Sequence, residues 1–484
     1  MSTISKQSLA SKALMLLLPL ITVVVTFFVI KSGQKAGIIF IVGCIGIALT
    51  VFGLLFPEFC FYYTIAVTYL LADVSRMVET DLPIGIVIDG LIGVTFLSVL
   101  FKKFIKKESF WLHCNHPIVY AYLIYFLYAT TEIFNPNASS VEFSIQIYRR
   151  YFTLQLFLYS AIQILSNMES INRFFKVFLS FALVAAAYGC YQEWVGYPRY
   201  ELDYIYSNPL LVALFGLNNG DFRKFSLLSD PTAFGILMAV VSLICVVFLF
   251  YAKRKRMKVF LGITFILSLL SMGYSGTRTA YAIFTAGIVV YIMMTLTNPK
   301  TLMFAAVSFL GFLVLMFGPI YGNNTINRIR TTFQFSEDAS YQVRDINRHN
   351  IQPYIYSHPF GGGIGSTGVL NMSENAGHPL AGFPTDSGLL RGALELGWVG
   401  LLIQCIVYFI VLQQAVKAYY NSRSRAVRPV LIACVLGLFA YILAHYTQLA
   451  IGPVPGAFLF YSLIAIIIRQ RQIDNETENL TFSF

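Results

Sequence analysis

Runs of about 20 apolar residues recur along almost the whole chain, and they constrain its fold more than any other feature. A run of this length can cross the hydrocarbon core of a bilayer as a helix. Of the 484 residues, 57% are hydrophobic and only 12% are charged, whereas about 25% are charged in a typical soluble domain. We therefore predict an all-α polytopic membrane protein. A transmembrane β-barrel is excluded, because its strands alternate apolar and polar residues.

The apolar runs predict about 12–14 transmembrane helices. The run at 59–74 is the weakest candidate, because it is short and is followed by Asp73 and Arg76. No small-residue cleavage site follows the first run, so we expect it to be kept as a helix and not removed as a signal peptide. The fourteen runs lie near residues 13–31, 37–56, 59–74, 83–104, 117–134, 151–167, 174–194, 232–251, 258–274, 279–297, 301–320, 396–416, 427–446 and 453–469.

Four clusters of Lys and Arg indicate the side of the membrane on which each loop lies, because cytoplasmic loops are enriched in these residues. With fourteen helices and the N-terminus inside, all four clusters are cytoplasmic, and Lys31 and Lys35 are the main exceptions. The net charge of +11 therefore orients helices and does not point to a nucleic-acid partner. The clusters are Lys102, Lys103, Lys106 and Lys107; KRKRMK at 253–258; Lys417, Arg423, Arg425 and Arg428; and Arg469 with Arg471.

The same topology places two long loops outside, near residues 196–230 and 321–384. We divide the chain into a transmembrane region at 1–320 that includes the smaller loop, a large external loop at 321–384, and C-terminal helices with a short cytoplasmic tail at 385–484. The large loop holds SHPFGGGIGSTG, residues 357–368, which lacks the Gly-Lys-Ser/Thr ending of a nucleotide-binding loop. Its glycines would form a tight turn or contact a lipid-linked diphosphate through their N–H groups.

Arginines at the predicted outer boundary are the first candidate binding residues. Arg278 lies in MGYSGTRTAYAIF, residues 272–284, where two apolar runs meet with almost no loop. A charge at this depth is costly without a partner, and the start of the next helix also favours an anion. Arg223 approaches the membrane from outside in FRKFSLLSDPTAFG, just before a helix that Asp230 is placed to cap. We expect Arg278 and Arg223 to bind an anionic ligand.

The large loop carries arginines and no lysine. The segment YQVRDINRHN, residues 341–350, has a helical pattern, and its spacing puts Arg344 and Arg348 on one face. Such a face is either a solvated amphipathic surface or an anion site, because guanidinium groups bind phosphate through two parallel hydrogen bonds. The four arginines of the loop are Arg328, Arg330, Arg344 and Arg348.

His378 and Asp386 lie where the large loop returns to the membrane, in HPLAGFPTDSGLLRGALELGWVGLL, residues 378–402. Either side chain could act as a general base toward a hydroxyl group. Each also has a structural explanation, since His378 would be an ordinary surface histidine and Asp386 would cap the helix that follows. The capping role of Asp386 favours His378 as the base, and both stay candidates.

Four segments, by their order and spacing, resemble the O-antigen ligase and O-antigen polymerase superfamily. SGTRTAY resembles its serine- and arginine-containing motif, YSHPFGGGIGS its proline- and glycine-rich loop element, and DSGLLRGALELGWVG its membrane re-entry segment. FRKFSLLSDPTAFG is similar to its arginine-then-proline segment before a central helix. The resemblance spans about residues 220–402. It implies a GT-C type glycosyltransferase that works without metal, nucleotide or other cofactor.

The resemblance also implies a substrate and roles for residues. The donor is a glycan linked through diphosphate to undecaprenyl, on the outer face of the bacterial cytoplasmic (inner) membrane, and Arg278 and Arg223 hold the diphosphate. Ligase-like members often have His-Asn where this chain has Asp386-Ser387. We therefore predict polymerisation of lipid-linked repeat units into a surface polysaccharide, with a ligase as the alternative. The expected partners are this glycan, the bilayer and other polysaccharide assembly proteins, and no nucleic acid.

A polytopic transporter or flippase is the second alternative. Four ionisable residues in or beside the apolar runs would form its ion path. Transporters usually show internal repeats and bind substrate near the midplane, whereas here we find no repeat and the polar residues concentrate at one face. The four residues are Asp73, Asp89, Glu193 and His445.

Overall fold

The computed structural model describes Gly43, Gly322 and residues 46–78, 84–217, 220–319, 324–333, 339–385 and 387–477. These residues are mostly helical, and the only β-pairing among them is two isolated bridges. The helices are α2 (Pro57–Val78), α3 (Ile84–Lys106), α4 (Pro117–Thr131), the short 3₁₀ helix η1 (Glu132–Phe134), α5 (Val141–Ile164), α6 (Met168–Trp194), α7 (Arg199–Tyr206), α8 (Pro209–Phe215), α9 (Pro231–Tyr251), α10 (Lys255–Tyr274), α11 (Arg278–Met294), α12 (Pro299–Phe317), α13 (Asn324–Thr332), α14 (Ala339–Ser357), α15 (Val369–Glu374), α16 (Gly388–Glu395), α17 (Gly397–Asn421), α18 (Arg428–Thr447) and α19 (Gly456–Thr477).

Eight of the described helices are long and apolar enough to cross a membrane, namely α3, α4 with η1, α6, α9, α10, α12, α17 and α18. The remaining predicted spans within the described residues also coincide with helices, α2, α5, α11 and α19, which fall short of that length or hydropathy. Gly46–Leu55 forms a shorter apolar helix. The predicted span at 13–31 lies outside the described residues. The chain is an all-α, multi-pass membrane protein, as the sequence predicts.

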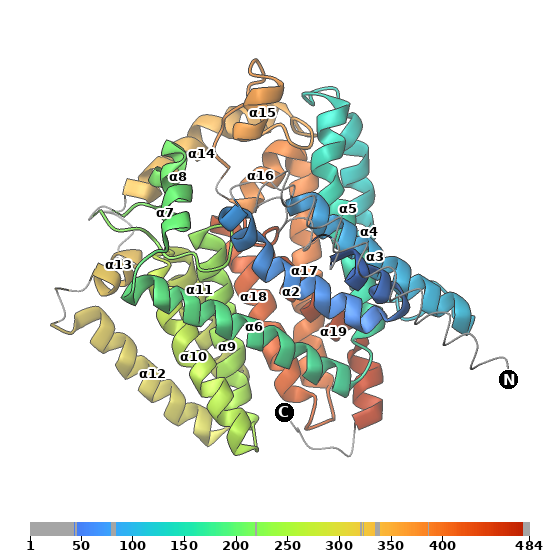
Figure 1. Cartoon of the computed structure of the whole chain (residues 1–484), viewed down its shortest axis with the longest axis vertical. Coiled ribbons are helices and arrows are strands. Elements are labelled where there is room, and N and C mark those ends of the chain that lie inside the picture. The colour runs from blue at the N-terminus through green and yellow to red at the C-terminus, as the bar shows by residue number, and fades with distance from the viewer. Residues whose placement is uncertain are drawn as a thin grey trace, which may run out of the picture.

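The core of the bundle lies around α9 and α18. These two helices pack against each other, and α10, α11, α17 and α19 surround them (Figure 1). Every residue of α9 from Phe234 to Phe248 is buried, whereas Thr301 is the only buried residue of α12. An apolar helix with so little protein contact presents its side chains to lipid. The helices α7, α8, α14, α15 and α16 gather at the upper end of the bundle in Figure 1, and α13 lies below them at its left side.

The start of α9 shows how local sequence sets a helix boundary next to the predicted site. Asp230 accepts hydrogen bonds from the N–H groups of Thr232 at 3.0 Å and Ala233 at 2.8 Å, and Pro231 occupies the first helical position. A proline costs nothing there, because the first N–H groups of a helix have no intrahelical acceptor. Asp230 is thus the cap that the sequence predicts.

Candidate functional site

Arg223 and Arg278, far apart in the sequence, meet at the turn between α10 and α11. Arg278 is the first residue of α11, directly after Thr277. The guanidinium group of Arg223 donates from Nη2 to Thr277 Oγ1 at 2.9 Å and from Nε to the carbonyl of Ser275 at 3.0 Å. The structure therefore brings the two predicted diphosphate-binding residues to one place, at the N-terminus of a helix, which itself favours an anion.

Arg328 joins them from the large loop. It lies on α13, and its Nε donates to the carbonyl of Gly276 at 2.7 Å. Gly276 adopts φ +60°, a conformation that favours glycine, and a Cβ atom there would lie 3.2 Å from Arg328 Nε, which would crowd this side chain. The charges of Arg328, Arg223 and Arg278 all act on the hydroxyl group of Tyr281. We call these three residues the arginine cluster.

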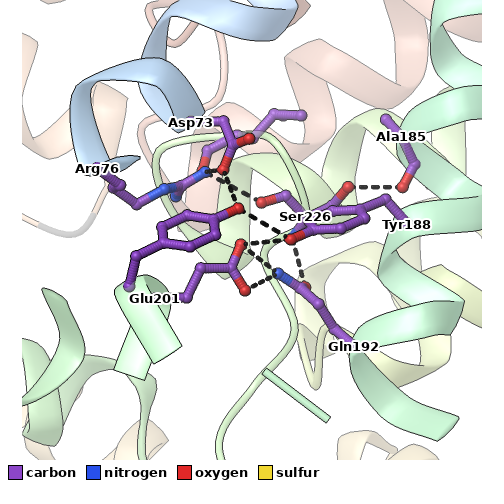
Figure 2. Close-up of polar contacts among 9 residues, drawn as sticks. Asp73, Arg76, Ala185, Tyr188, Gln192, Glu201 and Ser226 are labelled. Carbon is purple, nitrogen blue, oxygen red and sulfur yellow. Dashed lines mark hydrogen bonds and ion pairs between the residues drawn. The ribbon is translucent and has the colours of Figure 1, made fainter. Parts of the chain in front are cut away.

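A buried polar network fixes the segment that follows Arg223 (Figure 2). Arg76 of α2 donates to the carbonyls of Leu228 at 2.7 Å and Ser226 at 3.1 Å. Gln192 of α6 accepts a hydrogen bond from the N–H of Ser226 at 2.8 Å. Because two separate helices hold the backbone here, the arginine cluster rests on a rigid support.

Glu201 of α7 completes the same network from the smaller loop (Figure 2). Its side chain is fully buried, and Gln192 donates from Nε2 to both carboxylate oxygens at 3.0 and 2.9 Å. Tyr188 also donates to it at 3.2 Å. Burial raises the pKa of Glu201 to about 7, against the opposing effects of Gln192 and Arg76. This carboxyl group therefore changes charge near neutral pH.

Glu201 is expected to make the protein less stable as the pH rises from about 5 to about 7. The folded state keeps the proton at pH values where the unfolded chain has already released it. The contribution of Glu201 to the free energy of unfolding is therefore complete below a pH of about 4.5 and lost as the pH passes the folded pKa of about 7. Thermal unfolding of detergent-purified protein across this range measures the slope. Glu201→Gln should flatten it, whereas Asp203→Asn, at an exposed position of the same helix, should not. Equal slopes in wild type and Glu201→Gln would contradict the assignment.

The large loop contacts the end of α18 through α14. The guanidinium group of Arg348 lies 5.2 Å from the ring centroid of Tyr446, in the last turn of α18. The next residue, Thr447, hydrogen-bonds through its hydroxyl to that of Thr279 at 3.0 Å, one residue after Arg278. The predicted loop contact Arg348 thus lies over the helix ends that carry the site. Arg344 lies one turn earlier on α14, and its side chain is outside the described residues.

The last turn of α18 also borders a cavity of about 350 Å³ between α4, α5, α16, α17, α18 and α19. Five tyrosines line it, and Arg150, Arg391 and His445 supply polar groups. The Nδ1 atom of His445 accepts the N–H groups of Ala450 and Ile451 at 3.3 and 3.4 Å, which keeps this ring neutral. Aromatic faces with polar groups between them are suited to a sugar. The tyrosines are Tyr122, Tyr125, Tyr151, Tyr408 and Tyr461.

One wall of this cavity contains an ion pair between a partly exposed arginine and a buried carboxylate. Arg391 Nε lies 2.8 Å from Glu395 Oε1, one turn along α16, and Thr367 donates to the same oxygen at 2.6 Å. Glu395 is fully buried. Removing the cation would leave a carboxylate in a low-dielectric environment without its charge partner.

Arg391→Leu is therefore expected to destabilise the protein by about 1–3 kcal/mol, the usual cost of leaving a buried acceptor without its partner, because Arg391 itself is 31% exposed and the full cost of breaking a buried pair does not apply. The unfolding midpoint of the purified protein measures the loss. The double variant Arg391→Leu/Glu395→Leu is the matched control, because it removes both charges and should recover most of the stability. A single variant that unfolds at the wild-type temperature would show that Glu395 has another partner or is protonated.

His378 and Asp386, the two predicted bases, have different outcomes. His378 accepts the N–H of Leu380 on Nδ1 at 3.1 Å, and its Nε2 lies 2.9 Å from the carbonyl of Asn137, in the connection between α4 and α5. Both ring nitrogens thus contact backbone. Asp386 lies outside the described residues. The cap of α16 is Ser387, whose Oγ accepts the N–H of Leu390 at 3.3 Å, so the predicted capping role of Asp386 for this helix is wrong.

The glycine-rich stretch forms a tightly packed turn. Gly361 and Gly363 adopt φ +73° and +85°, and a Cβ atom would clash with Gly397 N at the first and lie 2.6 Å from Ala138 Cβ at the second. The N–H of Gly362 donates to the carbonyl of Leu394 at 2.8 Å. The stretch therefore packs the large loop against the start of α17 and the connection between η1 and α5, which is the tight-turn role left open by the sequence.

Comparison with known proteins identifies the segment that carries most of this site. Residues 263–405, from within α10 to the first half of α17, match the family described as O-Antigen ligase. These residues form an O-antigen ligase family domain. The resemblance of the sequence to the O-antigen ligase and polymerase superfamily is thereby confirmed. Two members of the arginine cluster, Arg278 and Arg328, and both predicted bases lie within the domain. A comparison with curated proteins found no match.

The sequence missed the contribution of Arg328 and of the residues that support the cluster. The one signal for Arg328 was its place in a loop that has arginines and no lysine. Nothing in the sequence marks Gln192 or Arg76 as partners of Ser226, because residues from separate helices meet only in the folded bundle.

Proposed function

We propose that this protein polymerises oligosaccharide repeat units that are linked by diphosphate to undecaprenyl, on the outer face of the bacterial cytoplasmic membrane. The observation that carries the proposal is the arginine cluster, in which three guanidinium groups from the smaller loop, α11 and α13 meet at a helix N-terminus of an O-antigen ligase family domain. Lipid diphosphates are the anionic part of the substrates of such enzymes, and arginines bind them through paired hydrogen bonds.

The chemistry follows from the charge that develops on the leaving group. The acceptor hydroxyl oxygen attacks the anomeric carbon of the donor sugar, a general base takes its proton, and the bond from that carbon to the diphosphate oxygen breaks. The lipid diphosphate leaves with the electron pair. Fixed positive charges placed before the reaction stabilise this developing charge without reorganisation. The tyrosine-lined cavity beside the last turn of α18 would hold sugars of the glycan.

The four residues that suggested a transporter instead have local structural partners. Asp73 pairs with Arg76 at 3.4 Å, Asp89 with Arg149 at 2.7 Å, and Glu193 with Lys224 at 3.4 Å. His445 is held by two backbone N–H groups. Separate partners in separate places favour roles in helix packing over a shared ion path.

A ligase is the second candidate, because the matched family carries that description. The sequence Asp386-Ser387 in place of His-Asn favours the polymerase. A strain that lacks the protein decides between them, through the glycans that remain on the lipid carrier. Single repeat units should accumulate if the protein is a polymerase, and full-length chains if it is a ligase. Normal surface polysaccharide with neither accumulation would contradict both functions.

The outer position of the site gives a separate test. We expect a cysteine introduced at Ser373, an exposed residue of the large loop, to react with a membrane-impermeant thiol reagent in intact cells, in a background without native cysteines. A cysteine at Lys255, in the KRKRMK cluster, should react only after the cells are opened. Labelling at 255 and not at 373 would reverse the topology and remove the proposed location.

A further inference from the structure

Besides the tyrosine-lined cavity, the structure has a cavity of about 290 Å³ that is lined mainly by polar and charged residues. It lies far from the arginine cluster. It is bordered by the N-terminal ends of α2 and α6 and the C-terminal ends of α3, α5 and α19. The helix α6 begins at this cavity with its cap Asn167 and ends at Trp194, beside the smaller loop. Its 27 residues put the two places about 40 Å apart. The cavity is therefore independent of the proposed catalytic site.

The strongest feature of this cavity is the buried arginine Arg469. Its side chain is only 4% exposed, and its Nε and Nη1 atoms reach no hydrogen-bond acceptor among the described residues. The charge of Glu476 acts on it without a hydrogen bond. A buried guanidinium group with unused donors is costly. A ligand that places a hydrogen-bond acceptor against Nε and Nη1 of Arg469 would remove this cost.

Lysines add further positive charge to the same cavity. Lys103 is 6% exposed, and Lys102 and Lys106 line the cavity from the same last turns of α3. Three carboxylates, Glu58, Glu108 and Glu476, also line the cavity. Glu108 lies 4.0 Å from Lys106 and Glu58 pairs with Arg173 outside the lining at 2.7 Å, so the balance of charge in the cavity stays positive. The cavity thus attracts an anion.

Gln472 indicates that the ligand also carries a hydroxyl group. Its Nε2 donates to Glu476 Oε1 at 2.8 Å, which fixes the orientation of the amide because a carboxylate only accepts. The other end of the amide, Oε1, is then buried and has no donor among the described residues. A hydroxyl donor from the ligand would satisfy it, while the phosphate of the ligand satisfies Arg469.

We propose that this cavity binds a phosphate ester that bears a hydroxyl group, with the phosphate against Arg469 and Lys103 and the hydroxyl against Gln472. Two sources offer this chemistry, the glycerol phosphate headgroup of an anionic lipid and a soluble polyol phosphate. Basic pockets between helices at the cytoplasmic membrane surface suit anionic headgroups, and the positive clusters predict that this end of the bundle is cytoplasmic. The bound ligand would contact the ends of α2, α3, α5, α6 and α19 and hold them together.

Lipid binding to the purified, detergent-solubilised protein tests the proposal. Phosphatidylglycerol and phosphatidylcholine with the same acyl chains are added, and retained lipid is measured by native mass spectrometry. Wild-type protein should retain phosphatidylglycerol in preference. Arg469→Gln should weaken this retention about tenfold or more, because hydrogen bonds to charged groups are lost. Arg471→Gln, which removes an exposed charge two residues along α19, is the matched control and should leave it unchanged.

Lys102→Gln/Lys106→Gln keeps the test decisive if the buried Arg469→Gln variant does not fold, because Lys102 and Lys106 are exposed on the cavity rim. This variant should also weaken retention of phosphatidylglycerol, and unchanged retention would overturn the proposal.

A competition experiment with glycerol 3-phosphate and inorganic phosphate tests the soluble source. Competition by glycerol 3-phosphate supports a soluble source, and binding of the lipid alone supports the membrane. No preference of the wild type for phosphatidylglycerol and no binding of either soluble phosphate would overturn it, as would equal losses in Arg471→Gln and Arg469→Gln.

Discussion

Arg278→Ala is expected to abolish glycan assembly while the protein still folds and reaches the membrane. Removing one fixed donor to a developing negative charge typically costs about 10²–10³-fold in rate, and Arg278 begins α11 at the centre of the arginine cluster. Arg278→Lys should fail almost as badly, because an ammonium group cannot form the paired hydrogen bonds of a guanidinium group. The measurement is polymer formation from a lipid-linked donor by purified protein, with polymer length in cells as a second readout.

Arg223 and Arg328 should behave in the same way, with an added structural effect. Arg223 also holds Thr277 and Ser275, and Arg328 holds Gly276, so their alanine variants loosen the turn between α10 and α11. The matched control is Arg330→Ala, two residues along α13 from Arg328. Its Nε donates to the carbonyl of Leu315 at 2.8 Å, at the end of α12, so its loss should leave most of the activity. Near-normal polymer from Arg278→Ala, or equal losses in Arg330→Ala and Arg328→Ala, would remove the cluster from the mechanism.

Hydropathy predicted where helices lie but not how far they extend. The predicted span 232–251 matches α9 closely, because Asp230 and Pro231 mark its start in the sequence. The span predicted at 151–167 belongs to α5, which begins ten residues earlier, at Val141. In the first turns of α5 polar residues alternate with apolar ones, so they form no apolar run, and the helix begins there because Ser140 caps it. Polar helical ends are invisible to a search for apolar runs.

The candidate site was predictable only where a local motif carried it. Arg223 and Arg278 stand in short, recognisable segments at a predicted boundary, and the structure brings them together. Arg328 reaches the same turn from α13, across a separation of 50 residues from Arg278 that no sequence spacing records. Arg469 was predicted to orient a helix, and the structure shows that its side chain is buried in a cavity. Burial depends on neighbours from other helices.

Removal of the general base is expected to cause the second large loss of activity. General base catalysis typically contributes about 10²–10⁴-fold. His378 has one ring nitrogen that accepts the N–H of Leu380 and another beside the carbonyl of Asn137, so neither is available unless the loop rearranges. Ser387 caps α16, so the cap of this helix does not require Asp386. We therefore expect Asp386→Asn to lower the rate by about 10²–10⁴-fold. The rate of His378→Ala should fall much less.

The two substitutions separate catalysis from structure because asparagine keeps the shape of aspartate and can still accept a hydrogen bond while losing its charge. Both variants are assayed as purified protein with a lipid-linked donor, alongside their unfolding midpoints. An active Asp386→Asn with an inactive, stable His378→Ala would reverse the assignment, and it would mean that the loop moves to free a nitrogen of His378. If both variants stay active, neither residue accepts the proton. The stabilisation of the departing diphosphate by the arginine cluster would then carry the catalysis, and the arginine variants would remain the only inactive ones.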